Sequence, residues 1–298
     1  MSWLDALILG IVQGLAEYLP ISSSGHLEIF RTILGLDLSG ADALQFNVVL
    51  HVATVLSTIF VLWREFVPLC TSFFTFRNDG NTRYVWKIIL SCVPVGIVGI
   101  CFKEQVESFF GVDNSGDSQL MVVGVFLCVT ALLLSVAYFT RTRAELASRR
   151  NIRPSHAFDT AGKNGRGGRD ISWLDAFVIG IGQAIAVLPG LSRSGTTIAT
   201  GIILGDNREK VAQFSFFMVI IPILGEAALD LYKYLSQSSD ATQSIGFLPM
   251  LIGFLSSFLV GCAACRWMLN LVKKGRLVWF ALYCVVAGVV CILWQCMH

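Results

Sequence analysis

SWLDALILGIVQGLAEYLPISSSG, at residues 2–25, returns at residues 172–195 as SWLDAFVIGIGQAIAVLPGLSRSG, without a gap and with 12 of 24 positions identical. Each copy is an apolar segment that meets a proline and ends in serines and a glycine. Related, interrupted apolar segments in the two halves of a membrane protein are typical of a binding site at the interface between repeats. The sequence therefore predicts two half-sites that descend from one duplicated segment.

The two copies differ at their chemically active positions. The first copy carries Glu17 and leads into His26, and the second has a valine and a threonine at those places. The second copy in turn has Arg193 where the first has Ser23. We interpret these differences as specialisation of the half-sites.

The composition is that of a polytopic membrane protein. Of the 298 residues, 55% are hydrophobic and only 14% are charged, and the mean hydropathy is +0.69, whereas about 25% of the residues of a soluble domain are charged. Six apolar runs approach the ~20 residues that cross a bilayer as a helix. These predicted spans lie near residues 44–63, 84–102, 120–140, 211–235, 244–265 and 277–297.

The apolar parts of the repeated segments, residues 6–16 and 176–188, are too short to span a bilayer. We interpret them as parts of two re-entrant helix-turn-helix segments, which are tolerated at membrane depth only where protein or a watery cavity satisfies their backbone. The predicted fold class is an all-α membrane protein of six transmembrane helices plus these two segments. Residues 1–298 form one integral membrane domain, with a first repeat at 1–140 and a second at 170–298.

Residues 141–169 between the repeats form a basic linker, with eight Lys and Arg residues against Glu145 and Asp159. By the positive-inside rule this linker is cytoplasmic. Threading the spans from it places the connections at 64–83 and 273–276 inside, and both termini outside. Three spans then separate the two repeated segments, so the repeats are inverted. The linker has no aromatic interleaving, and we expect no nucleic-acid partner.

The first half-site combines an acid, hydroxyls and an imidazole. Gln13 and Glu17 are four residues apart and share one helix face. Because an ionisable group in an apolar segment is costly, we interpret Glu17 as functional rather than as a packing carboxylate. His26 can exchange protons near neutral pH. Between them lies a polar turn whose serines cap a following helix and whose N–H groups suit a phosphate, formed by Ser22, Ser23, Ser24 and Gly25.

The second half-site adds a guanidinium to a similar turn. Arg193 lies in an apolar region and needs an anion, and its planar fork fits phosphate oxygens. An ion pair with Glu17 is the alternative in the ligand-free protein. Inverted repeats bring the two turns together, so that they converge on a multiply charged anion. The predicted phosphate-binding residues of this turn are Ser192, Arg193, Ser194, Gly195 and Thr196.

Two further polar residues lie in predicted spans. His51 is interpreted as a helix-packing residue in preference to a neighbour of the site. Glu226, together with Asp230, is expected to line either the cavity or its outer mouth.

The motifs QGLAEYLPISSSGH at 13–26 and PGLSRSGTT at 189–197 resemble the two signatures of the bacterial undecaprenyl-diphosphate phosphatase family linked to bacitracin resistance. The resemblance covers essentially the whole chain. It implies a phosphoric anhydride hydrolase of the bacterial inner membrane that releases inorganic phosphate from undecaprenyl diphosphate. The product, undecaprenyl phosphate, is the carrier lipid that peptidoglycan synthesis reuses in cell wall and cell shape formation.

The same resemblance implies which residues act. It makes Glu17, Ser23, His26 and Arg193 catalytic, and it implies a divalent cation, Mg²⁺ or Ca²⁺, held at Glu17 with Gln13. The nucleophile is either His26 itself or Ser23 or water activated by His26. The site is expected to open to the external side, and the partners are the polyprenyl diphosphate substrate and membrane lipids. A polyprenyl-phosphate flippase that uses the same anion site is the alternative function, and the oligomeric state is left open.

Overall fold

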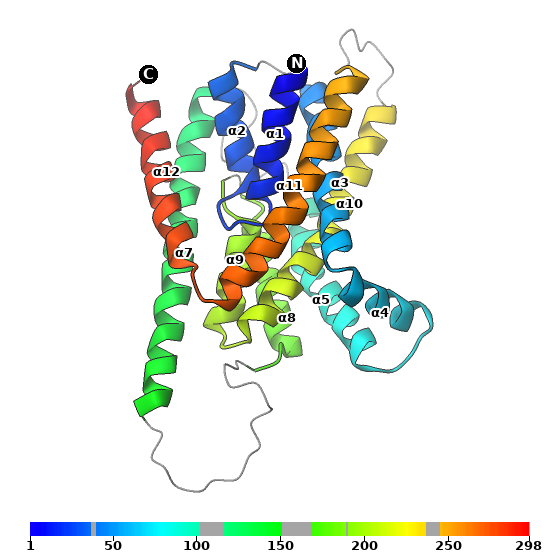
Figure 1. Ribbon diagram of the computed structural model, residues 1–298, viewed down its shortest axis with the longest axis vertical. Coiled ribbons are helices and arrows are strands. Elements are labelled where there is room, and N and C mark those ends of the chain that lie inside the picture. Colours follow the sequence, from blue (N-terminus) through cyan, green and yellow to red (C-terminus); the bar gives the residue numbers. More distant parts are fainter. Residues whose placement is uncertain (37–39, 102–115, 151–168, 189, 237–244, 298) are drawn as a thin grey trace, which may run out of the picture.

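The computed structural model describes residues 1–36, 40–101, 116–150, 169–188, 190–236 and 245–297 (Figure 1). Among these residues the regular structure is helical, apart from one β-bridge between Arg169 and Asp206. The helices are α1 (Trp3–Ala16), α2 (Ser23–Leu34), α3 (Gly40–Val61), α4 (Trp63–Phe74), α5 (Gly80–Cys101), α7 (Gly116–Arg150), α8 (Trp173–Ile185), α9 (Arg193–Ile203), α10 (Arg208–Ser236), α11 (Phe247–Lys273) and α12 (Val278–Met297).

Six helices in the described part of the chain are long and apolar enough to cross a membrane, which confirms the six predicted spans. Their apolar parts are Asp42–Val61, Gly80–Gly99, Leu120–Thr140, Arg208–Leu229, Phe247–Lys273 and Val278–Met297. By contrast, α1 and α8 are apolar but have only 14 and 13 residues. At about 1.5 Å per residue, each is shorter than the ~30 Å hydrocarbon core of a bilayer.

One helix was not predicted. α4 lies in the stretch 64–83, which the sequence analysis treats as a loop. Its first turn carries Arg64 and Glu65, and Pro68 interrupts its sequence pattern. Phe66 and Leu69, however, are three residues apart and pack on the hydrophobic core, so one face of the helix is buried.

The repeated segments begin with identical local structure. Ser2 caps α1 and accepts a hydrogen bond from Asp5 N, while the Asp5 carboxylate accepts one from Ser2 N at 2.8 Å. Ser172 and Asp175 form the same capping box at the start of α8. This reciprocal pairing satisfies two of the N–H groups that a helix start leaves free. The repeated SWLD quartet therefore fixes where both short helices begin.

The first short helix of each half of the chain packs against a long helix of the other half. α1 packs along α11 of the second half, and α8 packs along α5 of the first half. α7 packs on α12 and α3 packs on α10. In Figure 1, α1 and α2 lie in the part of the molecule that holds both termini, and α8 and α9 lie toward the opposite end. The loops that follow α1 and α8 therefore approach each other between them.

The end of the linker is fastened to the second half by ion pairs. Arg169 contacts the buried carboxylates of Asp175 at 2.7 Å and Asp206 at 3.2 Å. Lys87 of α5 donates a hydrogen bond to the carbonyl oxygen of Ile171 at 2.7 Å. At the other end of the predicted linker, residues 141–150 continue α7 as a helix. Residues 151–168, with three of the eight basic residues of the linker, lie outside the described residues.

Candidate active site

Two capped helix starts form the centre of the site. Ser22 caps α2, and its Oγ accepts a hydrogen bond from Gly25 N at 3.2 Å. Ser192 caps α9 in the same way, with Gly195 N as donor at 3.0 Å. The predicted N-caps are therefore confirmed. The first residues of the two helices are Ser23 and Arg193, so the residues that distinguish the repeats occupy equivalent positions at two positive helix ends.

The two turns touch each other through small residues. The Ser194 hydroxyl donates to the Leu19 carbonyl oxygen at 3.3 Å. A Cβ added at Gly195 would lie 3.1 Å from Cβ of Pro20, and one at Gly25 would lie 3.5 Å from Cα of Gly190. A side chain at Gly195 would therefore crowd Pro20, whereas one at Gly25 would make ordinary contact with Gly190. The two half-sites thus meet, as the sequence predicted, while Pro189 itself lies outside the described residues.

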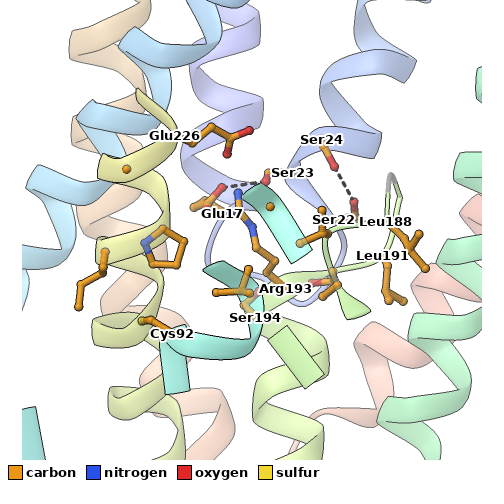
Figure 2. A pocket seen from close by; sticks show the side chains of 18 of the residues that line it. Glu17, Ser22, Ser23, Ser24, Cys92, Leu188, Leu191, Arg193, Ser194 and Glu226 are labelled. Atoms are coloured by element: carbon orange, nitrogen blue, oxygen red, sulfur yellow. Dashed lines mark hydrogen bonds between the residues drawn. The ribbon is translucent and has the colours of Figure 1, made fainter. Parts of the chain in front are cut away.

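A cavity of about 760 Å³ opens between the turns and helices α5 and α10. Figure 2 shows its polar side, where Arg193, Glu17 and Ser23 lie close together and Glu226 faces them. Of the two positions predicted for Glu226, the cavity and its outer mouth, the structure shows it in the cavity lining; nothing is described for the side chain of Asp230. The polar lining residues are Glu17, Ser22, Ser23, Ser24, Ser192, Arg193, Ser194 and Glu226.

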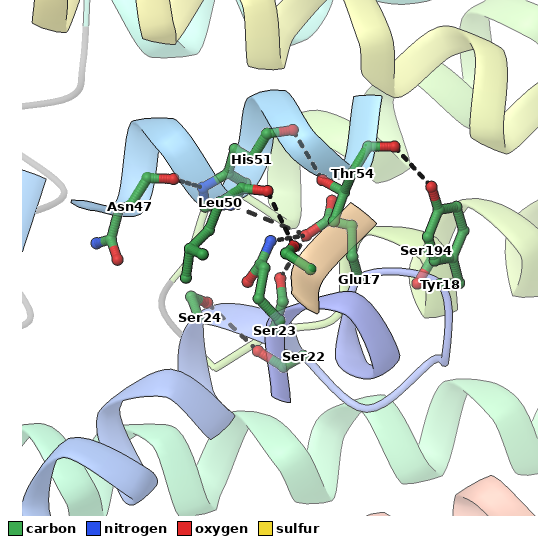
Figure 3. Close-up of polar contacts among 12 residues, drawn as sticks. Glu17, Tyr18, Ser22, Ser23, Ser24, Asn47, Leu50, His51, Thr54 and Ser194 are labelled. Carbon is green, nitrogen blue, oxygen red and sulfur yellow. Dashed lines mark hydrogen bonds and ion pairs between the residues drawn. The ribbon is translucent and has the colours of Figure 1, made fainter. Parts of the chain in front are cut away.

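Glu17 is the centre of the polar contacts in the first half-site (Figure 3). Its Oε2 accepts hydrogen bonds from Ser23 Oγ at 2.7 Å and from Gln13 Nε2 at 3.0 Å. His51 Nε2 lies 3.8 Å from the same oxygen. The side chain of Glu17 is only 8% exposed. A buried carboxylate with two donors and an imidazole beside it is held in one orientation, as proton transfer requires.

His51 belongs to the site rather than to helix packing alone, so the preferred sequence interpretation is wrong. Its Nδ1 lies 2.8 Å from the carbonyl oxygen of Asn47, one turn earlier in α3. A carbonyl oxygen can only accept, so Nδ1 carries the proton and Nε2 faces Glu17. A histidine 34 positions from Glu17 gives no local sequence signal of this contact.

Tyr18 anchors the turn that follows Glu17. Its hydroxyl contacts Ser57, Thr58 and the carbonyl oxygen of Thr54, all on α3. Its ring packs edge-on against Phe216 of α10, with the centroids 5.2 Å apart. These contacts tie the turn to both halves of the molecule, and they fix the position of the neighbouring Glu17.

Among the described residues that line the cavity, Arg193 is the one cation, and it shares this lining with Glu17. Within the described residues, its guanidinium makes no hydrogen bond and no ion pair closer than 4 Å with a protein group. A guanidinium with unused donors in a cavity lined by hydroxyls can bind the oxygens of an anion in bidentate fashion.

His26 does not reach the cavity, although the sequence analysis placed it among the reacting groups. Its Nδ1 lies 2.8 Å from the Ser22 carbonyl oxygen, and its Nε2 lies 2.7 Å from the hydroxyl of Tyr283 on α12. The two rings stack with centroids 5.6 Å apart. Both nitrogens are occupied because α2 turns this side chain toward α12.

Three predicted phosphate-binding residues also lie outside the cavity lining. The N–H groups of Gly25 and Gly195 are used by the serine caps. Thr196 is buried, and its Oγ1 has no hydrogen-bond partner among the described residues. The glycines instead allow the close contact between the two turns.

The rest of the cavity wall is apolar. It is formed by residues of α5, α10 and the second turn, among them Val95, Val187 and Ile221. A second, purely apolar groove of about 480 Å³ runs between α5 and α8 and shares Val187 and Leu188 with the cavity. The cavity and the groove are therefore neighbours on the two sides of Val187 and Leu188.

The donor set of the first half-site suits a hard divalent cation. Mg²⁺ and Ca²⁺ bind oxygen ligands, and Glu17 supplies a carboxylate beside the hydroxyl of Ser23. Oε1 of Gln13 is buried without a hydrogen-bond partner among the described residues, because Nε2 makes the contact with Glu17. An orphaned amide oxygen next to a carboxylate fits a cation ligand.

The fold and the site define a polytopic helical membrane protein with an arginine, a carboxylate and serine hydroxyls gathered at two helix starts. The chain belongs to the family described as bacitracin resistance protein BacA, whose model matches residues 6–290. It is 48% identical to an undecaprenyl-diphosphatase of Bacteroides thetaiotaomicron over 99% of this chain and all of that protein. Proteins of the same name from Methanobrevibacter smithii and Oceanobacillus iheyensis are 34% and 31% identical, over 100% and 96% of this chain and 99% and 94% of theirs.

Proposed function

We propose that this protein hydrolyses undecaprenyl diphosphate to undecaprenyl phosphate and inorganic phosphate. One observation carries the proposal: the Ser23 hydroxyl, hydrogen-bonded to Glu17, lies in the same cavity as Arg193. An acceptor for a proton, a nucleophilic oxygen and a guanidinium are the parts that phosphoryl transfer needs. The full-length similarity to proteins named undecaprenyl-diphosphatase supports the same activity. The released carrier lipid would return to peptidoglycan synthesis, and this recycling would confer bacitracin resistance.

The diphosphate binds between the two turns. Arg193 pairs with phosphate oxygens, and the starts of α2 and α9 direct their positive ends at them. Ser22, Ser24 and Ser192 line the same volume and supply hydroxyl donors. The negative charge that spreads over the transferred group is neutralised where it develops.

Ser23 is the nucleophile and Glu17 its general base. As Ser23 Oγ attacks the terminal phosphorus, its proton passes to Glu17 over the existing 2.7 Å hydrogen bond. A bond from Oγ to phosphorus forms, the bond from phosphorus to the bridging oxygen breaks, and undecaprenyl phosphate leaves. Water then attacks the phosphoserine, inorganic phosphate departs, and Ser23 regains its proton. We assign His26 neither the role of nucleophile nor that of base, because both of its ring nitrogens make contacts away from the cavity.

Glu17 and Gln13 would hold the divalent cation, Mg²⁺ or Ca²⁺. Such an ion, when bound, supplies positive charge to the diphosphate oxygens. The orphaned Oε1 of Gln13 beside the carboxylate supports this assignment.

The polyprenyl tail lies in the apolar groove between α5 and α8. The groove joins the cavity at Val187 and Leu188, so a lipid whose diphosphate is at Arg193 can extend directly into it. Its other walls include Pro94, Ile97 and Ile185. An apolar chain gains binding energy there in proportion to the apolar surface that it covers.

The pairs α1–α2 and α8–α9 are re-entrant segments of two inverted repeats in the bacterial inner membrane. Three observations support this arrangement: α1 and α8 are too short to span, the two pairs lie in opposite parts of the molecule (Figure 1), and each short helix packs on a long helix of the other half. The basic end of α7 and the α11–α12 turn would face the cytoplasm. Both termini would then face outward, and the cavity would open to that side.

A lipid-phosphate flippase would use the same anion site, and inverted repeats favour such a carrier. The Ser23–Glu17 pair favours hydrolysis, because a carrier has no use for a nucleophile with a base. The test is phosphate release from undecaprenyl diphosphate by purified protein in detergent, with Arg193→Ala alongside. Release by the wild type and not by the variant supports the phosphatase. Absence of release, with Arg193-dependent movement of labelled lipid across vesicles, would overturn the phosphatase in favour of the flippase.

A further inference from the structure

The turn that presents Ser23 is strained, and its counterpart in the second repeat is not. Ser22 has φ 70° and ψ 104°, in a region that residues with a Cβ rarely occupy. Ser192, at the equivalent position, has φ −72° and ψ 117°, an ordinary extended conformation. Strained backbone persists only where the surrounding structure enforces it. Some contact present in the first half-site and absent from the second must therefore hold Ser22.

One contact of this kind is made by the side chain of residue 26. In both turns the backbone N–H four residues on donates to the serine carbonyl oxygen, from His26 at 3.1 Å and from Thr196 at 2.9 Å. Only the first turn adds a ring: His26 Nδ1 lies 2.8 Å from the Ser22 carbonyl oxygen. Threonine at 196 makes no such contact in the second. The imidazole therefore holds the carbonyl group of the strained residue from a second direction.

Tyr283 fixes the tautomer and the orientation of the His26 imidazole. The carbonyl oxygen of Ser22 only accepts, so in neutral His26 the proton is on Nδ1 and the lone pair on Nε2. The Tyr283 hydroxyl, 2.7 Å from Nε2, is then the donor. Its ring also stacks on the imidazole with 21° between the planes. One hydrogen bond and one stacking contact from α12 thus fix both the tautomer and the ring orientation of His26.

We propose that Tyr283 is a positioning residue: through His26 it holds Ser22 in its strained conformation, and so keeps Ser23 Oγ directed at Glu17. Tyr283 touches neither the cavity nor the substrate seat. It acts on the nucleophile across three linked contacts, from α12 to the start of α2. The inference rests on the proposed phosphatase activity and adds a residue of the last helix to it.

Turnover of Tyr283→Phe tests the proposal, because this change keeps the ring and removes only the hydroxyl. We expect kcat to fall about 10- to 100-fold with little change in KM, as for a misdirected reacting group. Tyr84→Phe is the matched control, since Tyr84 packs on Phe214 far along α5, and it should leave kcat unchanged. Unchanged kcat in Tyr283→Phe would overturn the proposal.

The same substitution made in a Ser22→Gly protein distinguishes a positioning role of Tyr283 from general damage to the fold. Glycine adopts positive φ without strain. A protein with Ser22→Gly should therefore no longer need the clamp, by which we mean the contacts of Tyr283 with His26 and of His26 with residue 22, whatever effect the glycine itself has on activity. Tyr283→Phe should then lower kcat less than about 2-fold in Ser22→Gly, against about 10-fold or more in the wild type. An equal fold-change in both backgrounds would refute a role through Ser22.

The tautomer of His26 gives a readout that does not depend on catalysis. Imidazole ¹⁵N chemical shifts, assigned by comparison with His26→Gln, should show the Nδ1–H form in the wild type and its loss or exchange in Tyr283→Phe. If the wild type released no phosphate but showed this pattern, the proposed function would fail and the clamp would stand. An active wild type with the other tautomer at His26 would contradict the clamp alone.

Discussion

Ser23 Oγ lies 2.7 Å from Glu17 Oε2, and this hydrogen bond joins the first residue of α2 to the residue that caps the end of α1. The five residues between the two positions form the turn that meets the second repeat. Proximity of this kind depends on the turn conformation rather than on one rigid helix. The turn that interrupts the apolar segment therefore brings the reacting groups together. Both copies of the repeat have such an interruption.

Glu17→Gln keeps the shape of the side chain and removes its capacity to accept a proton. We expect kcat to fall about 10²- to 10⁴-fold, the usual worth of a general base. Glu28→Gln, on the same short helix as Ser23 but paired with Arg31, is the control and should retain turnover. Steady-state phosphate release measures both, and an active Glu17→Gln would show that Ser23 needs no base there.

Arg193→Lys tests the shape of the cation rather than its charge. An ammonium keeps the positive charge and loses the planar fork that binds two phosphate oxygens. We expect kcat/KM to fall about 10²- to 10³-fold, comparable with the loss of one oxyanion donor. If Arg193→Lys matched the wild type, a point charge would suffice, and bidentate binding would be refuted.

The groove between α5 and α8 predicts an effect that depends on lipid length. Ile97→Trp narrows the groove at an exposed position. We expect KM for undecaprenyl diphosphate to rise about 10-fold, with little change for a short-chain diphosphate that does not reach the groove. Leu132→Trp, at an equally lipid-facing place on α7, is the control. Equal KM changes for both lipids would place the tail elsewhere.

The packing of the second turn against α7 predicts an unusual sensitivity at one glycine. Gly190 has φ +86°, and a Cβ there would lie 2.7 Å from Cα of Val123. Gly205 has a similar φ of +94° with open space around it. We expect Gly205→Ala to cost about 1–2 kcal/mol in unfolding free energy and Gly190→Ala about 3–5 kcal/mol, because overpacking adds to strain. Equal losses in denaturant titrations would show that the turn and α7 can move apart at little cost in free energy.

Arg169→Ala should make stability depend on pH. Burial and the nearby Asp175 raise the pKa of Asp206, and Arg169 opposes them. Without Arg169 we expect the unfolding free energy to fall by about 1–2 kcal/mol at neutral pH. This is less than the loss expected for a fully buried ion pair, because the side chain of Arg169 is more than half exposed. A raised folded-state pKa means that the folded protein binds the proton more readily, so stability should recover as pH falls toward the ordinary aspartate range.

The double variant Arg169→Ala with Asp206→Asn is the control for that pH effect. An amide at residue 206 does not titrate, so the recovery at low pH should disappear. Unfolding followed by tryptophan fluorescence between pH 7 and about pH 4.5 compares the two proteins over the relevant window. Recovery of equal size in both would assign the effect to another group.

Much of the architecture could be predicted because a bilayer imposes simple requirements on sequence. The six spans are long and apolar, and the SWLD quartets and the serines mark helix starts by capping. α4 was missed because its buried face is only two or three side chains wide and its first turn is charged. Such a helix gives neither a span-like run nor a clear cap.

The sequence predicted the residues of the two turns. It did not predict the contacts that these residues make with distant helices. Glu17, Ser23 and Arg193 carry strong signals, since charge and hydroxyls in apolar segments are rare. The contact of His51 with Glu17 and that of Tyr283 with His26 depend on which helix faces cross in space. Tyr283 is 257 residues from His26, so no periodicity in one sequence can link the two.

The most direct test compares kcat of Ser23→Ala with that of His26→Gln on the same lipid diphosphate. With Ser23 as nucleophile and His26 as a support of the turn, Ser23→Ala should lose about 10⁴-fold or more, and His26→Gln about 10- to 100-fold. Substantial turnover by Ser23→Ala, with none by His26→Gln, would contradict the account and return the imidazole to the reaction centre.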